Sequence, residues 1–136
     1  MRCDHFDAGT CRSCSLLPQP YERQLAGKAE AIAATLSPVL GADEIAWLAP
    51  ASSPQKGFRT SAKLVVGGTR RRPTLGILGP DRRGIDLPGC PIQHPAINRA
   101  TPGLKRFIRS LSLTPYDVPT KRGELKNILI TVGEGE

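Results

Sequence analysis

The stretch Cys3-Asp4-His5-Phe6-Asp7-Ala8-Gly9-Thr10-Cys11-Arg12-Ser13-Cys14 decides how the chain folds, because it holds three of the four cysteines. The fourth, Cys90, stands far along the chain in Gly89-Cys90-Pro91. Three thiols close together in sequence and one distant thiol are typical of a metal or cluster site with four thiolate ligands. A site of this kind would link the N-terminus to the middle of the chain.

Three interpretations of the cysteines compete. Disulfides belong to oxidising compartments, and the N-terminus lacks the apolar stretch of a secretion signal. Structural zinc accepts four cysteines, but zinc modules usually supply them as two pairs. A fourth cysteine followed by proline recurs among iron–sulfur proteins. We therefore expect a 4Fe–4S cluster, with zinc as the alternative and disulfides third, held by Cys3, Cys11, Cys14 and Cys90.

Two histidines lie near these cysteines in the sequence. His5 and His94 could each replace a thiol. Because four thiols are available, we expect both histidines to be exposed or to lie just outside the ligand set.

Length and composition predict one domain. A chain of 136 residues buries about two thirds of its unfolded surface, and 13 prolines and 14 glycines indicate many turns and loops. No apolar run approaches the roughly 20 residues of a membrane span. We expect a soluble, cytoplasmic protein with no membrane partner.

The net charge of +7 is concentrated in one segment, residues 56–83, which carries eight basic side chains and one acidic side chain. Such a concentration is the electrostatic footprint expected for a polyanion. The alternative is a solvated basic hairpin that only keeps the protein in solution. We expect contact with nucleic acid through Lys56, Arg59, Lys63, Arg70, Arg71, Arg72, Arg82 and Arg83.

Hydrophobic periodicity predicts an α+β fold with a small, mostly antiparallel sheet and two main helices. The first helix is expected over 21–37, with its apolar stripe facing the core and Pro38 and Gly41 ending it. The second is expected over 96–111, where Pro102 either starts the helix or kinks it.

Four segments are expected to be strands. Residues 58–68 and 74–78 are rich in β-forming side chains and are joined by a turn, so they predict a hairpin. A short strand over 85–87 leads to Cys90. The apolar segment 125–132 predicts a last strand inside the sheet, not at its edge.

The cysteine loop and three later segments, 57–66, 89–92 and 122–129, resemble the bacterial 23S ribosomal RNA uracil-5-methyltransferases. The resemblance is to the branch that lacks an N-terminal OB-like (TRAM) domain, and it covers essentially the whole chain in the same order. One departure is visible: Thr60 and Ser61 stand where the family has Asn-Lys, which removes one basic side chain.

The resemblance implies an S-adenosylmethionine-dependent enzyme. In that family a cysteine adds to carbon 6 of uracil, carbon 5 takes the methyl group, and a carboxylate removes the remaining proton. These parts belong to a C-terminal Rossmann-like domain whose motifs this chain lacks, so we name no catalytic residue.

What remains is expected to position RNA. Residues 1–20, with Cys90, would form a cluster loop tied to the sheet, and residues 21–136 would form part of a central α+β RNA-binding domain. The expected partner is ribosomal RNA and not DNA, and the chain is expected to be inactive alone. The alternative is a stand-alone iron–sulfur or zinc nucleic-acid-binding module.

Overall fold

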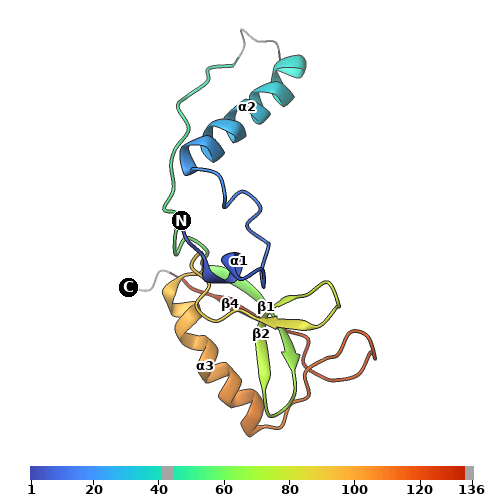
Figure 1. The fold of residues 1–136 in the computed structure, drawn as a ribbon. Helices are drawn as coiled ribbons and strands as arrows, with labels where there is room; N and C mark the ends of the chain where they lie inside the picture. Colours follow the sequence, from blue (N-terminus) through green and yellow to red (C-terminus); the bar gives the residue numbers. More distant parts are fainter. Residues whose placement is uncertain (41–44, 134–136) are drawn as a thin grey trace.

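The computed structural model describes residues 1–40 and 45–133. It has the predicted α+β architecture: four strands form one antiparallel sheet in the order β3-β2-β1-β4, accompanied by two main helices and one short helix (Figure 1). In chain order the elements are α1 (Asp4–Asp7), α2 (Tyr21–Leu40), β1 (Ser61–Gly68), β2 (Pro73–Leu78), β3 (Gly84–Asp86), α3 (Pro95–Ser110) and β4 (Asn127–Thr131).

The sequence predicted the hairpin of β1 and β2, and the two strands form the centre of the sheet. Val65 pairs with Gly76, and the ladder runs on to Gly68, which pairs with Pro73. Gly68 has a φ of +73°, a conformation that glycine adopts readily. Two backbone hydrogen bonds between Thr69 and Arg72, of 3.0 and 3.1 Å, then close the turn.

The core lies between one face of the sheet and α3. Alternate residues of a strand point to the same face, so Ala62, Leu64 and Val66 of β1 all reach this core together with Leu75 of β2. Helix α3 contributes Ile97 and Ile108, both fully buried. The helix begins at Pro95, after His94, whose Nδ1 accepts a hydrogen bond from the Ala96 N–H at 3.3 Å. Pro102 therefore lies inside α3 and does not start it.

The sheet curls strongly at β3. A Cβ placed on Gly67 of β1 would lie 2.6 Å from the Cα of Gly84, although β2 separates the two strands in the sheet. Glycine at both positions allows this close approach of two backbones. The turn that connects β2 to β3 is thereby brought close to β1.

Helix α2 differs from its prediction in two ways. It continues through Pro38 to Leu40. Proline removes only one hydrogen-bond donor, so the residues after it can still complete the last turn. Gly41 lies outside the described residues. The predicted core-facing stripe is wrong: no residue of α2 is buried, and Ile32 and Leu36 are 53% and 37% exposed. Figure 1 shows the reason, since α2 projects away from the sheet.

In the described part of the chain, no helix is long and apolar enough to cross a membrane.

Strand β4 forms where the sequence predicts a strand, but its expected interior position is wrong. Among the described residues it pairs with β1 alone and lies at an edge of the sheet. Ile128 and Ile130 pack against the core, whereas Leu129 on the opposite face is 75% exposed. The apolar run thus reflects one buried face and one exposed leucine.

Candidate cluster site and basic surface

The N-terminal cysteine loop is built around the short helix α1, which the sequence did not predict. Cys3 precedes the helix, and its carbonyl accepts hydrogen bonds from the backbone N–H groups of Phe6 (3.0 Å) and Asp7 (2.9 Å). The chain then folds back, because the Cys11 N–H donates to the His5 carbonyl at 3.0 Å. These local bonds bring Cys11 back beside the helix that Cys3 begins.

Cys90 is held in place from three directions. It follows β3 and Gly89, which has a φ of +67°. Its carbonyl accepts hydrogen bonds from the Gln93 N–H at 3.1 Å and from Asn98 Nδ2 of α3 at 3.0 Å. The next residue, Pro91, accepts a 2.9 Å hydrogen bond from the Gly57 N–H. Cys90 therefore stands where β3, α3 and the lead-in to β1 meet.

All four cysteines line one small cavity of about 20 Å³. Cys3 is buried and the other three are half-buried, and all four are free cysteines. The pKa of the Cys14 thiol is raised, first by burial and then by the neighbouring Cys90, Cys11 and Cys3, while Arg59 opposes the rise. The structure thus brings together the three thiols of the loop and the distant thiol of Cys90.

His5 and His94 take different positions. His5 also lines the cysteine cavity, and its Nε2–H donates to the Pro88 carbonyl at 2.7 Å. The His5 ring therefore lies beside the thiols, and its Nε2–H group is already hydrogen-bonded to a backbone carbonyl. His94 instead caps α3 through Nδ1.

The geometry of the thiols bears on which group they could hold. Within the described residues, no three cysteine, histidine or acidic side chains are arranged to bind a single metal ion. The four cysteines nevertheless line the same cavity. Four free thiols with this arrangement fit the ligand set of a four-cysteine cluster, in which each thiolate binds a different iron.

The eight predicted basic residues are all exposed, and they fall into separate groups. Lys56 and Arg59 precede β1, and the Arg59 N–H donates to the Ile92 carbonyl at 2.9 Å, close to Cys90. Lys63 lies midway along β1, opposite Leu129 of β4. The remaining five lie in turns: Arg70, Arg71 and Arg72 between β1 and β2, and Arg82 and Arg83 between β2 and β3.

The two arginine turns lie near each other because the sheet curls. Arg82 and Arg83 line a cavity of about 270 Å³ together with Thr69, beside Arg70, and Tyr116 of the segment after α3. Arg70 is further fixed by a 2.8 Å hydrogen bond from its Nε to the Thr114 hydroxyl. Strand β1 spans eight residues, so about 25 Å separates the turn that holds Arg70, Arg71 and Arg72 from Lys56 and Arg59.

A larger cavity of about 350 Å³ adjoins the cysteine site, and sequence reasoning missed most of it. Cys14 and Arg59 line it together with Tyr21 and Lys28 of α2. One feature of the sequence could have indicated this cavity: the segment that forms α2 comes directly after the cysteine loop. The apolar stripe of that helix suggested a core element instead.

Fold and cysteine arrangement together define an α+β domain that carries a four-thiol site and a basic hairpin. No family model matches the chain. It is 44% identical, over all 136 residues, to the 23S rRNA (uracil(747)-C(5))-methyltransferase RlmC of Halothiobacillus neapolitanus, and the match covers 35% of that protein.

Two other relatives match the chain to a similar extent. RlmC of an Enterobacter species is 44% identical over 132 residues, and RlmC of Serratia proteamaculans is 43% identical over 131 residues; each match covers 96% of this chain and 34% of the relative. The chain therefore matches the N-terminal part of the 23S rRNA uracil-C5-methyltransferases and spans about a third of their length. This match confirms the family resemblance seen in the sequence.

Proposed function

We propose that this chain is the cluster-binding and RNA-positioning portion of an S-adenosylmethionine-dependent 23S rRNA uracil-5-methyltransferase. One observation carries the proposal: four thiols, from positions 3, 11, 14 and 90, line one cavity in a chain 44% identical to RlmC over its whole length. The cofactor and the catalytic groups would belong to the rest of such an enzyme. A cytoplasmic location would follow from a ribosomal RNA substrate.

Cys3, Cys11, Cys14 and Cys90 would hold a 4Fe–4S cluster. The bound cluster would supply a covalent link between the N-terminal loop and the residues that connect β3 to α3. The spacing of the cysteines in the sequence, three close together and a distant fourth followed by proline, supports a cluster over zinc, because zinc modules usually supply their cysteines as two pairs. We assign the cluster a structural role, since four protein thiolates leave no iron open to a substrate.

The basic residues would contact the RNA backbone. Phosphate contacts fix the position and orientation of a protein on nucleic acid without reading its sequence. The arginine turns suit this role because Arg71, Arg72, Arg82 and Arg83 are all exposed. Arg82 and Arg83 line a cavity that Thr69, at the start of the other turn, also lines.

The test is RNA binding with a charge-matched control. A fragment of 23S rRNA that contains uracil 747, the nucleotide named for the relatives, is titrated at several salt concentrations. Replacing Arg70, Arg71 and Arg72 with alanine should weaken binding and lower the salt slope by about 0.7–0.9 for each phosphate that the variant no longer neutralises. The control replaces three exposed arginines of α3, Arg99, Arg106 and Arg109, with alanine.

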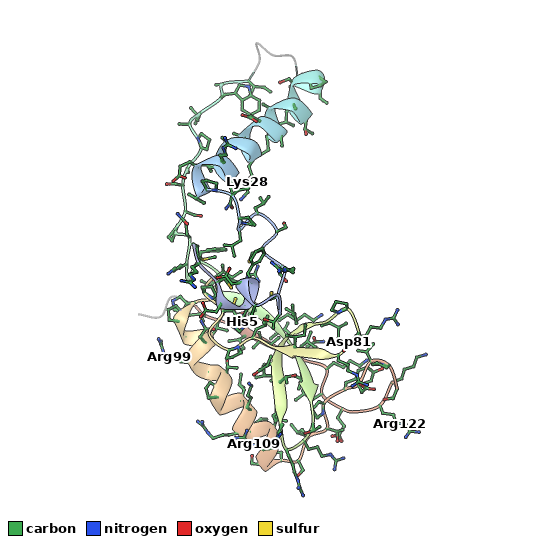
Figure 2. All side chains as sticks on the ribbon, viewed as in Figure 1. His5, Lys28, Asp81, Arg99, Arg109 and Arg122 are labelled. Carbon is green, nitrogen blue, oxygen red and sulfur yellow. The ribbon has the colours of Figure 1, made fainter. Side chains whose placement is uncertain are left out.

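Both triple variants lose the same charge, so any non-specific electrostatic effect is equal. In Figure 2, Arg99 lies near the start of α3 and Arg109 near its end, so the control arginines are spread along the helix and are not gathered in one turn. We expect the α3 variant to bind nearly as tightly as the unchanged chain. If both variants bound RNA equally weakly, the turn between β1 and β2 would have no specific part in the RNA interface.

A further inference from the structure

The cavity of about 350 Å³ beside the cysteine site has the dimensions of a ligand pocket. Such pockets usually measure about 300–1,000 Å³. Three parts of the chain form its wall: the cysteine loop at Cys14, the first turns of α2 at Tyr21 and Lys28, and the lead-in to β1 at Phe58 and Arg59. The pocket therefore exists only when the lead-in to β1 is assembled with the N-terminal segment that contains Cys14 and α2.

The pocket wall is cationic. Lys28 and Arg59 both line it, and none of the described residues that line it is acidic. Positive groups without acidic partners suit an anionic ligand such as a phosphodiester.

The pocket also holds aromatic surface that is scarce in this protein. The chain has only three phenylalanines, two tyrosines and one tryptophan, and Phe58 and Tyr21 both line the pocket. The ring of Phe58 is half exposed. Its neighbours Gly57 and Arg59 donate backbone hydrogen bonds of 2.9 Å to Pro91 and Ile92, which anchors this segment next to Cys90.

Tyr21 is fixed by its hydroxyl. The Ser53 N–H donates to Tyr21 Oη at 2.8 Å, and the two hydroxyl groups lie 3.3 Å apart. The ring is therefore oriented before any ligand arrives. A pre-oriented ring loses less conformational entropy on binding than a mobile one.

We propose that this pocket binds one unpaired nucleotide of the RNA, with its base stacked on Phe58 and its phosphate between Lys28 and Arg59. The proposal rests on the RNA-binding function proposed above and deepens it, because it assigns a site for a single-stranded base to this chain. Recognition of single-stranded RNA commonly combines base stacking on aromatic rings with cationic contacts to the backbone. A base within a duplex could not enter, since both of its faces are covered.

The first test compares two phenylalanines of similar exposure. Phe58 is 50% exposed and lines the pocket, whereas Phe107 on α3 is 54% exposed and lies outside it. Binding of a short labelled single-stranded RNA and of a duplex of equal length is measured by fluorescence anisotropy. We expect Phe58→Leu to weaken single-strand binding by at least about fivefold. Duplex binding should be unchanged, and Phe107→Leu should change neither.

The second test uses two basic residues of α2. Lys28 lines the pocket, and Arg23 is exposed on the same helix outside it. Lys28→Gln should lower the salt slope for single-stranded RNA by about 0.7, the value expected when one phosphate is no longer neutralised. Arg23→Gln should leave the slope unchanged. Both positions are exposed, so this pair reports on the pocket even if Phe58→Leu misfolds.

The outcomes separate the pocket from the wider function. If the unchanged chain binds neither RNA, the proposed RNA-binding function fails. If it binds RNA but each pocket variant behaves like its control, the pocket assignment is overturned while the function stands. A selective loss of single-strand affinity in Phe58→Leu and Lys28→Gln supports the pocket.

Discussion

Replacing Cys90 with serine tests whether the two ends of the cysteine arrangement are linked through a bound group. Serine has nearly the same shape as cysteine but is a poor ligand for iron. Cys90 is half-buried and its carbonyl, not its thiol, makes the hydrogen bonds to Gln93 and Asn98. The variant should therefore keep the local fold and lose only the link.

The size of the effect follows from the length of the loop that the link closes. Because about 75 residues separate Cys14 from Cys90, the chain-entropy treatment of a cross-link gives about 4–5 kcal/mol of stabilisation. A free energy of unfolding is typically 5–15 kcal/mol for a domain. Loss of the link should therefore remove a large share of the stability of the loaded chain.

The assay is urea unfolding, followed by circular dichroism, of two pairs of samples. In the loaded pair, the unchanged chain and Cys90→Ser are both treated with iron and sulfide under anaerobic conditions, and only the unchanged chain should keep the cluster; in the stripped pair, both are treated with a chelator. We expect the substitution to lower the free energy of unfolding by about 4–5 kcal/mol in the loaded pair. In the stripped pair we expect a change below about 1 kcal/mol. Equal losses in both pairs would refute the reasoning, because Cys90 would then act through packing alone.

Three further predictions follow from the fold. Gly67→Ala should destabilise the chain by about 1–3 kcal/mol in urea unfolding, because its Cβ would lie 2.6 Å from a backbone atom of β3; an unchanged stability would contradict the curl of the sheet. Ile97→Ala should lower the free energy of unfolding by about 2–5 kcal/mol, because Ile97 is fully buried. Ile32→Ala on α2 should lower it by less than about 1 kcal/mol, because Ile32 is 53% exposed. Similar losses in the two variants would show that α2 packs in a core. Hydrogen bonds from Thr120, first from its side chain and then from its backbone N–H, lower the pKa of the Asp117 carboxyl. The stability that the Asp117 carboxylate contributes is therefore complete above pH 3.8, the ordinary pKa of the group. This stability is lost as the pH falls through the lowered pKa. Thr120→Val should raise that pKa toward 3.8 in an NMR titration, and no movement would exclude the bond.

The sequence was informative where spacing or local periodicity decides the outcome. The cysteine pattern predicted that Cys90 would join the three N-terminal thiols, and all four line one cavity. The β-forming side chains of residues 58–68 predicted a strand, and Ala62, Leu64 and Val66 of β1 lie in the core. The hairpin followed from β-forming segments on either side of a compact turn.

The sequence was misleading where the outcome depends on what an element packs against. The apolar stripe of α2 shows helical periodicity, but periodicity does not say whether a sheet lies opposite, and Ile32 and Leu36 remain exposed. The pocket beside Cys14 depends on contacts between distant residues, such as the bond from Ser53 to Tyr21. Such contacts leave no pattern in a local stretch of sequence.

The most direct test of the four-thiol site is the metal content of the chain purified without oxygen. We predict about four irons and four acid-labile sulfides per unchanged chain, with a visible iron–sulfur absorbance, and loss of both in Cys3→Ser, Cys11→Ser, Cys14→Ser and Cys90→Ser. One zinc per chain without iron, or a Cys90→Ser variant that keeps the full iron content, would contradict the account.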